Sequence, residues 1–242
     1  MDAARSASPR TGGALPAAAT AAGALLAAVF RAVGAARRDR ALHPRGATFG
    51  AVVTTTGSGA SGVPWLDQAA STEVTLRVSR ATGLPAPLPD IHGIALRVPG
   101  QALGKDGPAD LLFAGTGDSS LGRFVLAPRL RADGGPLTTL LPYRSPRGPL
   151  ELRLVPHGGP RHDGPVPAGF TLSYAIGSGQ WRDVGEVVVG AALPESVDRV
   201  RHDPVLNLLP GTSQYGVVSR LREPSYRAAR SVPARSRGAG RQ

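Results

Sequence analysis

The sequence predicts a mainly β protein of the α+β class, with an antiparallel β-barrel or sandwich, a helix before it and helices after it. Short stretches that alternate or run apolar over four to eight residues recur between residues 47 and 193, separated by glycine and proline. No helical pattern interrupts them, which argues against a parallel α/β sheet. Hydrophobic residues make up 41% of the chain, enough for a sizeable core.

The N-terminal part divides in two. Residues 1–17 contain Ala, Ser, Gly and Pro without periodicity, which predicts a disordered leader. Residues 20–38, TAAGALLAAVFRAVGAARR, place apolar side chains at three- and four-residue steps and predict an amphipathic helix. A targeting segment and a membrane span are the alternatives for this apolar run. Pro16 and the absence of a cleavage-like boundary favour a docking helix, so no membrane span is expected.

Nine strands are expected in the central region. They are TFGAVV (48–53), EVTLRVS (73–79), HGIALRV (92–98), DLLFAG (110–115), RFVLAPRL (123–130), LTTLLPY (137–143), LELRLVP (150–156), FTLSYAIG (170–177) and GEVVVGAAL (185–193). The pieces between them, such as PHGGPRHDGPVP, have the composition of turns and loops.

Helical patterns return after Pro194. They are ESVDRVR (195–201), DPVLNLL (203–209) and SRLREPSYRAARS (219–231). The last residues, 232–242, form a basic tail that we expect to be disordered. Residues 18–231 are therefore expected to form a single domain.

The net charge of +11 does not by itself indicate a nucleic-acid partner. Only Lys105 of the 28 basic residues is a lysine, and this bias, with the abundance of Ala, Gly and Pro, is typical of a GC-rich coding sequence. The arginines are scattered and aromatic residues make up 5%, whereas nucleic-acid-binding proteins gather basic residues on one face. Arginine equally suits a carboxylated or phosphorylated small molecule. The absence of cysteine excludes disulfides and thiol catalysis.

Two stretches carry candidate site residues near the start of the strand region. RALHPRG, residues 40–46, holds His43 between two arginines, in a position where an ordinary loop histidine is also common. In the strand VTLRVS, alternation places Arg77 and Ser79 on one face. If that face is inward, the buried arginine requires an anion; otherwise the face is exposed to solvent.

Two loops offer weaker chemistry. GDSS resembles the GDS block of SGNH-type hydrolases, with Ser119 as nucleophile, but Asp198 and His202 are spaced one residue too far apart for its Asp-x-x-His pair. The loop PHGGPRHDGP (156–165) contains two histidines and an aspartate, although flexible Gly/Pro loops hold metal ligands poorly.

Read in chain order, these stretches resemble the heme-dependent catalase superfamily. RALHPRG resembles its Arg-x-x-His-Ala-x-Gly block, and TEVTLRVSRATG resembles Val-x-Val-Arg-Phe-Ser. LPDIHGIALRV and ADLLFAG resemble Asp-x-Arg-Gly-x-Ala-Val-Lys-Phe and Asp-Leu-x-x-Asn. RLREPSY resembles the Arg-x-x-x-Tyr helix that supplies the proximal heme ligand. The resemblance covers residues 38–115 and 220–230, and implies a minimal antiparallel β-barrel of catalase type that binds heme b.

The resemblance also implies a role for each matching residue. Tyr226 would be the axial ligand, bound as phenolate, and Arg222 one helical turn away would favour its ionised form. His43 would be the distal acid/base, with its ring oriented by Ser79. Further residues around the ring would be Arg40, Arg77 and Arg230 at the propionates and Leu42 on the distal side.

Three departures from the family pattern limit the expected activity. Ala114 stands where the family has a distal Asn that helps place hydrogen peroxide, and His92 and Pro44 replace a family Arg and Ala. The resemblance therefore implies a weak peroxidase acting on organic or hydrogen peroxides rather than an efficient catalase. The alternative is a non-enzymatic protein that binds or stores heme or another acidic apolar ligand, and a serine hydrolase or phosphodiesterase is a remote third. A cytoplasmic location and a homodimer are further expectations.

Overall fold

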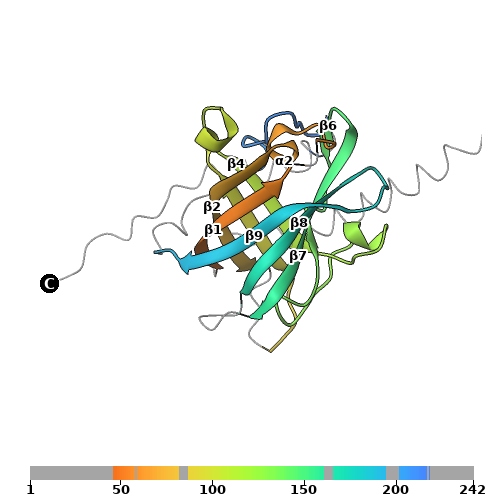
Figure 1. Cartoon of the computed structure of the whole chain (residues 1–242). Coiled ribbons are helices and arrows are strands. Elements are labelled where there is room, and N and C mark those ends of the chain that lie inside the picture. Colours follow the sequence, from red (N-terminus) through yellow and green to blue (C-terminus); the bar gives the residue numbers. More distant parts are fainter. Residues whose placement is uncertain are drawn as a thin grey trace, which may run out of the picture.

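A computed structural model describes residues 46–57, 59–81, 87–160, 166–194, 202–216 and 218 (Figure 1). The regular secondary structure of this part of the chain is almost entirely β. Its strands are β1 (Gly46–Thr56), β2 (Ala69–Arg80), β3 (His92–Val98), β4 (Ala109–Gly115), β5 (Leu137–Thr138), β6 (Tyr143–Ser145), β7 (Gly148–Pro160), β8 (Pro167–Ile176) and β9 (Arg182–Ala192). Its helical pieces are α2 (Pro64–Asp67) and two 3-10 turns, Gly100–Leu103 and Gly122–Phe124.

The strands form one antiparallel sheet that closes on itself. Its order is β5-β4-β3-β2-β1-β9-β8-β7-β6, and β5 also pairs with β7 through Leu137–Leu154 and Thr138–Arg153. Eight strands therefore make a closed barrel, with β6 attached to β7. This confirms the predicted mainly β fold class and decides for a barrel over a sandwich. The helices expected at 20–38, 195–201 and 219–231 lie outside the described residues.

The barrel interior is filled by every second side chain of each strand. Contributors to this core include Phe49, Val53, Leu76, Ile94, Leu96, Leu111, Phe113, Leu152, Leu154, Phe170, Leu172 and Val187. Burying a side chain of this size stabilises the fold by about 1.5–3 kcal/mol relative to leaving it exposed. The side chains that alternate with them point to the outer face of the barrel.

One end of the barrel is closed by α2 and by the segment 202–216. Trp65 and Leu66 of α2 and Leu209 of the segment belong to the same buried cluster as the strand residues. Figure 1 shows α2, β6 and this segment gathered at the upper end of the barrel. No helix in the described part of the chain is long and apolar enough to cross a membrane.

Asp110 of β4 fixes the segment 202–216 to the barrel. Its carboxylate accepts hydrogen bonds from Arg97 Nε (2.7 Å) and Nη2 (2.8 Å), from Asn207 Nδ2 (2.6 Å) and from the backbone N–H of Asp203 (2.8 Å). Burial acts to raise the pKa of Asp110, but the hydrogen bonds, led by that from Arg97, outweigh it and hold the pKa below its usual value.

The helix predicted at 203–209 is wrong, since these residues make a single turn. The backbone N–H of Asn207 donates to the Asp203 carbonyl at 2.9 Å, and Asp203 Oδ1 accepts from the N–H groups of Val205 and Leu206. Asp and Asn side chains that bond the nearby backbone compete with helix formation. Here Asn207 also turns its amide to Asp110, so the turn does not continue.

Two predicted strands differ from those observed. Residues 123–130 begin in a 3-10 turn and then make only isolated bridges, one of them between Arg129 and Asp90. Pro128 cannot donate to a ladder, which disfavours a strand there. The stretch 137–143 splits into β5 and β6 because Leu140 adopts a positive φ of 60°, which ends the extended run.

Candidate functional site

Arg77 and Ser79, the two predicted site residues within the described part of the chain, lie on the outer face of β2. Leu76, which precedes Arg77 in the strand, is 0% exposed and belongs to the buried cluster. Because side chains alternate along a strand, Arg77 and Ser79 point away from the interior. The polar face is thus not the inward face. It is not freely exposed either, because Ser79 is 9% exposed and Arg77 is half-buried.

Ser79 belongs to a row of small residues that crosses four strands. The register pairs Gly46 of β1 with Ser79, Ser79 with Gly93 of β3, and Gly93 with Ala114 of β4. Neighbouring strands are about 4.8 Å apart, so the row is about 14 Å long. Ser79 Oγ lies 3.4 Å from the Gly93 carbonyl oxygen, to which it donates a long hydrogen bond. We call these four residues the small-residue strip. Its largest side chain is that of serine.

Arg77 lies across the β1 end of the small-residue strip. A Cβ at Gly46 would stand 2.5 Å from Arg77 Nη2 and 2.8 Å from the Val78 carbonyl oxygen. The guanidinium therefore occupies space that only glycine leaves open. Gly46 ends the stretch RALHPRG, so the first two candidate stretches of the sequence meet at this point.

The remaining predicted site residues lie beyond the part of the chain that the structure describes. They are Arg40, Leu42, His43, Arg222, Tyr226 and Arg230. Their roles stay predictions. The structure brings together Arg77, Ser79 and the Ala114 position, and leaves these six without a description.

His92 takes no part in the strip. Its Nε2 lies 3.1 Å from the Arg129 carbonyl oxygen and must carry the proton, because a carbonyl oxygen can only accept. Burial lowers the pKa of His92, so the ring is neutral at neutral pH. Its role in this fold is to fasten the 116–136 connection to the start of β3.

Ser119 lies in an exposed turn of the connection between β4 and β5. Its Oγ accepts a hydrogen bond from the backbone N–H of Gly122 at 2.9 Å, and its carbonyl accepts one from Arg123 at 3.0 Å. This is the usual chemistry of a serine turn. Asp198, the aspartate of the hydrolase hypothesis, lies outside the described residues.

The loop that follows β7 shows no metal centre in its described part. His157 is exposed on β7, and residues 162 and 163 are not described. Within the described ranges, no three His, Cys, Asp or Glu side chains are grouped in a way that could hold a metal ion.

A buried charged cluster on the outer face of β7 was not predicted. Glu151 is 1% exposed and Arg123 is 3% exposed, with Arg123 Nη1 3.7 Å from Glu151 Oε2. Arg123 also donates from Nη2 to the Gly179 carbonyl at 3.2 Å. The Cζ atoms of Arg123 and Arg153 lie 4.5 Å and 4.7 Å from the centroid of the Trp181 ring. Two guanidinium groups thus hold this ring by cation–π contacts.

The strand pattern could not reveal this cluster. LELRLVP alternates leucine with charged residues, which predicts Glu151 and Arg153 on a solvent-facing surface. The connection between β4 and β5 covers them instead: Arg123 comes from it, and Asp118 accepts a 2.8 Å hydrogen bond from Arg153. Only tertiary packing of this long connection decides that the polar face is buried.

Burial raises the pKa of Glu151 to about 7, and the opposing effect of Arg123 is smaller. Neither carboxylate oxygen has a hydrogen-bond partner among the described residues. The 3.7 Å separation from Arg123 is too long for a hydrogen bond. The Glu151 carboxyl therefore gains and loses its proton near neutral pH.

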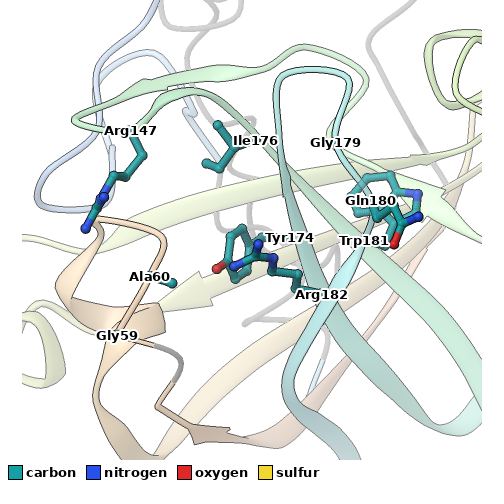
Figure 2. A pocket seen from close by; sticks show the side chains of 9 residues that line it. All are labelled: Gly59, Ala60, Arg147, Tyr174, Ile176, Gly179, Gln180, Trp181 and Arg182. Carbon is teal, nitrogen blue, oxygen red and sulfur yellow. The ribbon is translucent and has the colours of Figure 1, made fainter.

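A pocket of about 660 Å³ opens at the α2 end of the barrel (Figure 2). It is lined by residues of the β1–β2 connection, of the β6–β7 turn, of β8, of the turn after β8 and of the start of β9: Gly59, Ala60, Arg147, Tyr174, Ile176, Gly179, Gln180, Trp181 and Arg182. We call it the end pocket. The small-residue strip lies toward the other end of the barrel, where β1 begins and β2 ends.

Comparison with known proteins does not assign a family. No protein-family model matches the chain, and no curated protein matches it.

Proposed function

We propose that this protein is a catalase-like heme-binding protein that slowly reduces organic or hydrogen peroxides with electrons from an external donor. The observation that carries the proposal is the small-residue strip. Each of four sequence stretches that resemble consecutive catalase blocks contributes one residue to it: Gly46, Ser79, Gly93 and Ala114. Consecutive antiparallel strands lie side by side in any such barrel; what supports the proposal is that the register places a small residue of each block in one row. A cytoplasmic location and a homodimer go with this proposal as predictions.

The described residues fit one face of a planar macrocycle. The four residues of the strip carry no side chain longer than a serine, which suits a flat ring between Ser79 and Ala114, with the Arg77 guanidinium over the Gly46 end. Ligand sites of this kind are mostly apolar, with a few placed polar groups. Ser79 supplies a hydroxyl, and Arg77 supplies a half-buried cation that matches a propionate.

The resemblance supplies the groups on either side of the ring. Tyr226 would hold the iron as a phenolate, and Arg222 would lower the pKa of its hydroxyl. His43 would move a peroxide proton from one oxygen to the other. Gly46 follows His43 by three positions in the chain, which spans at most about 11 Å. Heme, if bound, would supply the redox chemistry of peroxide reduction.

Ala114 is the reason to expect slow turnover. It ends the small-residue strip in the position of the family's distal Asn, and its methyl group cannot hydrogen-bond a peroxide. The same residue favours the second candidate, a protein that binds or stores heme, or another acidic apolar ligand, without turnover. The two candidates share the ligand and differ in chemistry.

A hemin titration tests the shared claim. Replacing Arg77 with glutamine should weaken hemin binding about tenfold, because a charge-assisted contact to a propionate is lost. The control is Arg144→Gln, which removes the same charge from an exposed position on β6. Equal hemin affinities for wild type, Arg77→Gln and Arg144→Gln would count against heme on this face.

Peroxide turnover separates the two candidates. A weak peroxidase should lose turnover in His43→Ala and keep it in His157→Ala, which changes an exposed histidine on β7. Ala114→Asn should raise turnover by restoring a hydrogen-bonding side chain at the end of the strip. A heme-loaded wild type that turns over no peroxide would leave the binding protein as the function.

A further inference from the structure

We propose that the end pocket binds a small organic anion, a carboxylate or phosphate ester with an apolar body. This inference is independent of heme, because the end pocket is lined by different strands and turns from those of the small-residue strip. Charge, an unsatisfied buried hydroxyl and a fixed aromatic ring support it.

The lining of the end pocket carries positive charge only. Arg147 and Arg182 are exposed at its rim, and neither forms an ion pair within the described residues. No Asp or Glu contributes to the lining. The Arg147 side chain runs over Gly62, where an added Cβ would come 3.1 Å from its Cγ. Two cations facing a concave site raise its potential and attract anions.

The floor of the end pocket contains a buried hydroxyl that has no partner. Tyr174 is 1% exposed, and its hydroxyl makes no hydrogen bond among the described residues. Phenylalanine would fill the same space in the core without that cost. In Figure 2 the hydroxyl points toward Ala60, with Arg182 beside the ring, and Tyr174 and Arg182 are register partners on β8 and β9. A ligand oxygen placed there would satisfy the hydroxyl and meet the guanidinium.

The rest of the end pocket suits an apolar body. Ile176 and Trp181 line it, and the Trp181 ring is held by Arg123 and Arg153 in the cluster on β7. A ring held in place before binding loses little freedom when a ligand packs on it. The volume of about 660 Å³ lies within the usual range for small-molecule sites. The anionic head would therefore lie at Arg147, Arg182 and Tyr174, with the body against Trp181.

Calorimetric titration of the full-length protein with four probes tests the inference. Phenyl phosphate and benzoate combine an anion with an apolar ring, benzyl alcohol has only the ring, and inorganic phosphate has only the anion. We expect saturable binding of phenyl phosphate, benzoate or both, at least about tenfold tighter than benzyl alcohol and inorganic phosphate. Whichever of the two anions binds tighter gives the ligand class. Failure of both to bind, or equal binding of benzyl alcohol, would overturn the inference.

Variants locate the binding. The double change Arg147→Gln and Arg182→Gln should weaken probe binding at least about tenfold, whereas Arg144→Gln removes a nearby exposed charge and should change it less than about twofold. Equal probe affinity of the wild type and the double variant would overturn the assignment of the anion site to Arg147 and Arg182.

Tyr174→Phe should weaken binding severalfold without lowering thermal stability, a combination that a purely structural role of the hydroxyl does not give. Unchanged affinity or lower stability in this variant would contradict the role given to the hydroxyl. Tyr226→Phe should leave probe binding intact, so the heme proposal and this one can fail separately.

Discussion

Replacing Glu151 with glutamine should make the protein more stable above neutral pH. Glu151 is 1% exposed, neither of its oxygens has a hydrogen-bond partner among the described residues, and burial raises its pKa to about 7. Folding therefore favours the protonated carboxyl. Glutamine has nearly the same shape and stays neutral, so the variant imitates the protonated wild type at every pH.

The size of the effect follows from the difference between the two pKa values. The pKa of Glu151 rises from 4.5 to about 7 on folding, and each unit corresponds to about 1.4 kcal/mol, which gives roughly 3 kcal/mol. Because the pKa in the folded state is raised, this contribution is fully present below pH 4.5. It is lost as the pH rises toward 7, where the folded protein must also ionise a buried carboxyl.

Denaturant unfolding of both proteins at about pH 4.5, 6 and 8 measures the effect. The free energies of unfolding should agree at the lowest pH and differ by about 3 kcal/mol at the highest, with the variant more stable. Burial lowers the pKa of His92, but this residue is present in both proteins, so its contribution cancels in the difference. Glu186→Gln, an exposed change on β9, should follow the wild type.

If the free energies of unfolding of wild type and Glu151→Gln changed in parallel with pH, the raised pKa of Glu151 would be refuted. A variant less stable than wild type at the highest pH would also refute it. That result would mean that the ionised carboxylate is stabilised by Arg123, 3.7 Å away, by more than burial costs it.

Three other predictions concern single side chains. Gly46→Ala should cost about 1–3 kcal/mol in unfolding free energy, because the new Cβ would stand 2.8 Å from the Val78 carbonyl oxygen, a backbone atom, and it should also weaken hemin binding by displacing the Arg77 guanidinium. Tyr174→Phe should leave thermal stability unchanged or raise it by about 1 kcal/mol, since the lost hydroxyl has no partner in the described structure. Asp110→Asn should cost about 2–3 kcal/mol near neutral pH because it removes the charge that Arg97 binds. The wild type should lose this contribution as the pH falls below 3.8, the usual pKa of the group, and a flat difference across that range would contradict it.

Period-two alternation was enough to predict most of the barrel. The strands around Leu76, Ile94 and Phe170 alternate or run apolar between clear turn signals, and each appears where it was expected. Alternation also placed Arg77 and Ser79 correctly on one face. It could not say which face is the interior, because closure of the sheet through β5 and β7 decides that.

The errors lie where one residue or a tertiary contact overrides the local pattern. Leu140 adopts a positive φ, which divides one expected strand in two. Leucine rarely takes this conformation, so the sequence gives no sign of it. The apolar run that contains Arg123 predicts a strand. In the structure Arg123 lies in a 3-10 turn instead, and its side chain is buried against Glu151 and the Trp181 ring. The end pocket joins turns that are far apart in the chain, so no local motif could have marked Tyr174 as part of a site.

Heme binding through Tyr226 can be read from the absorption spectrum of the protein reconstituted with heme. We expect a high-spin ferric spectrum with tyrosinate as the axial ligand. Tyr226→Phe should abolish it, and Tyr215→Phe, which changes a half-buried tyrosine in the closing segment, should preserve it. A heme spectrum that is the same in wild type and Tyr226→Phe would contradict the ligand assignment, and no heme uptake by the wild type would contradict the proposed function.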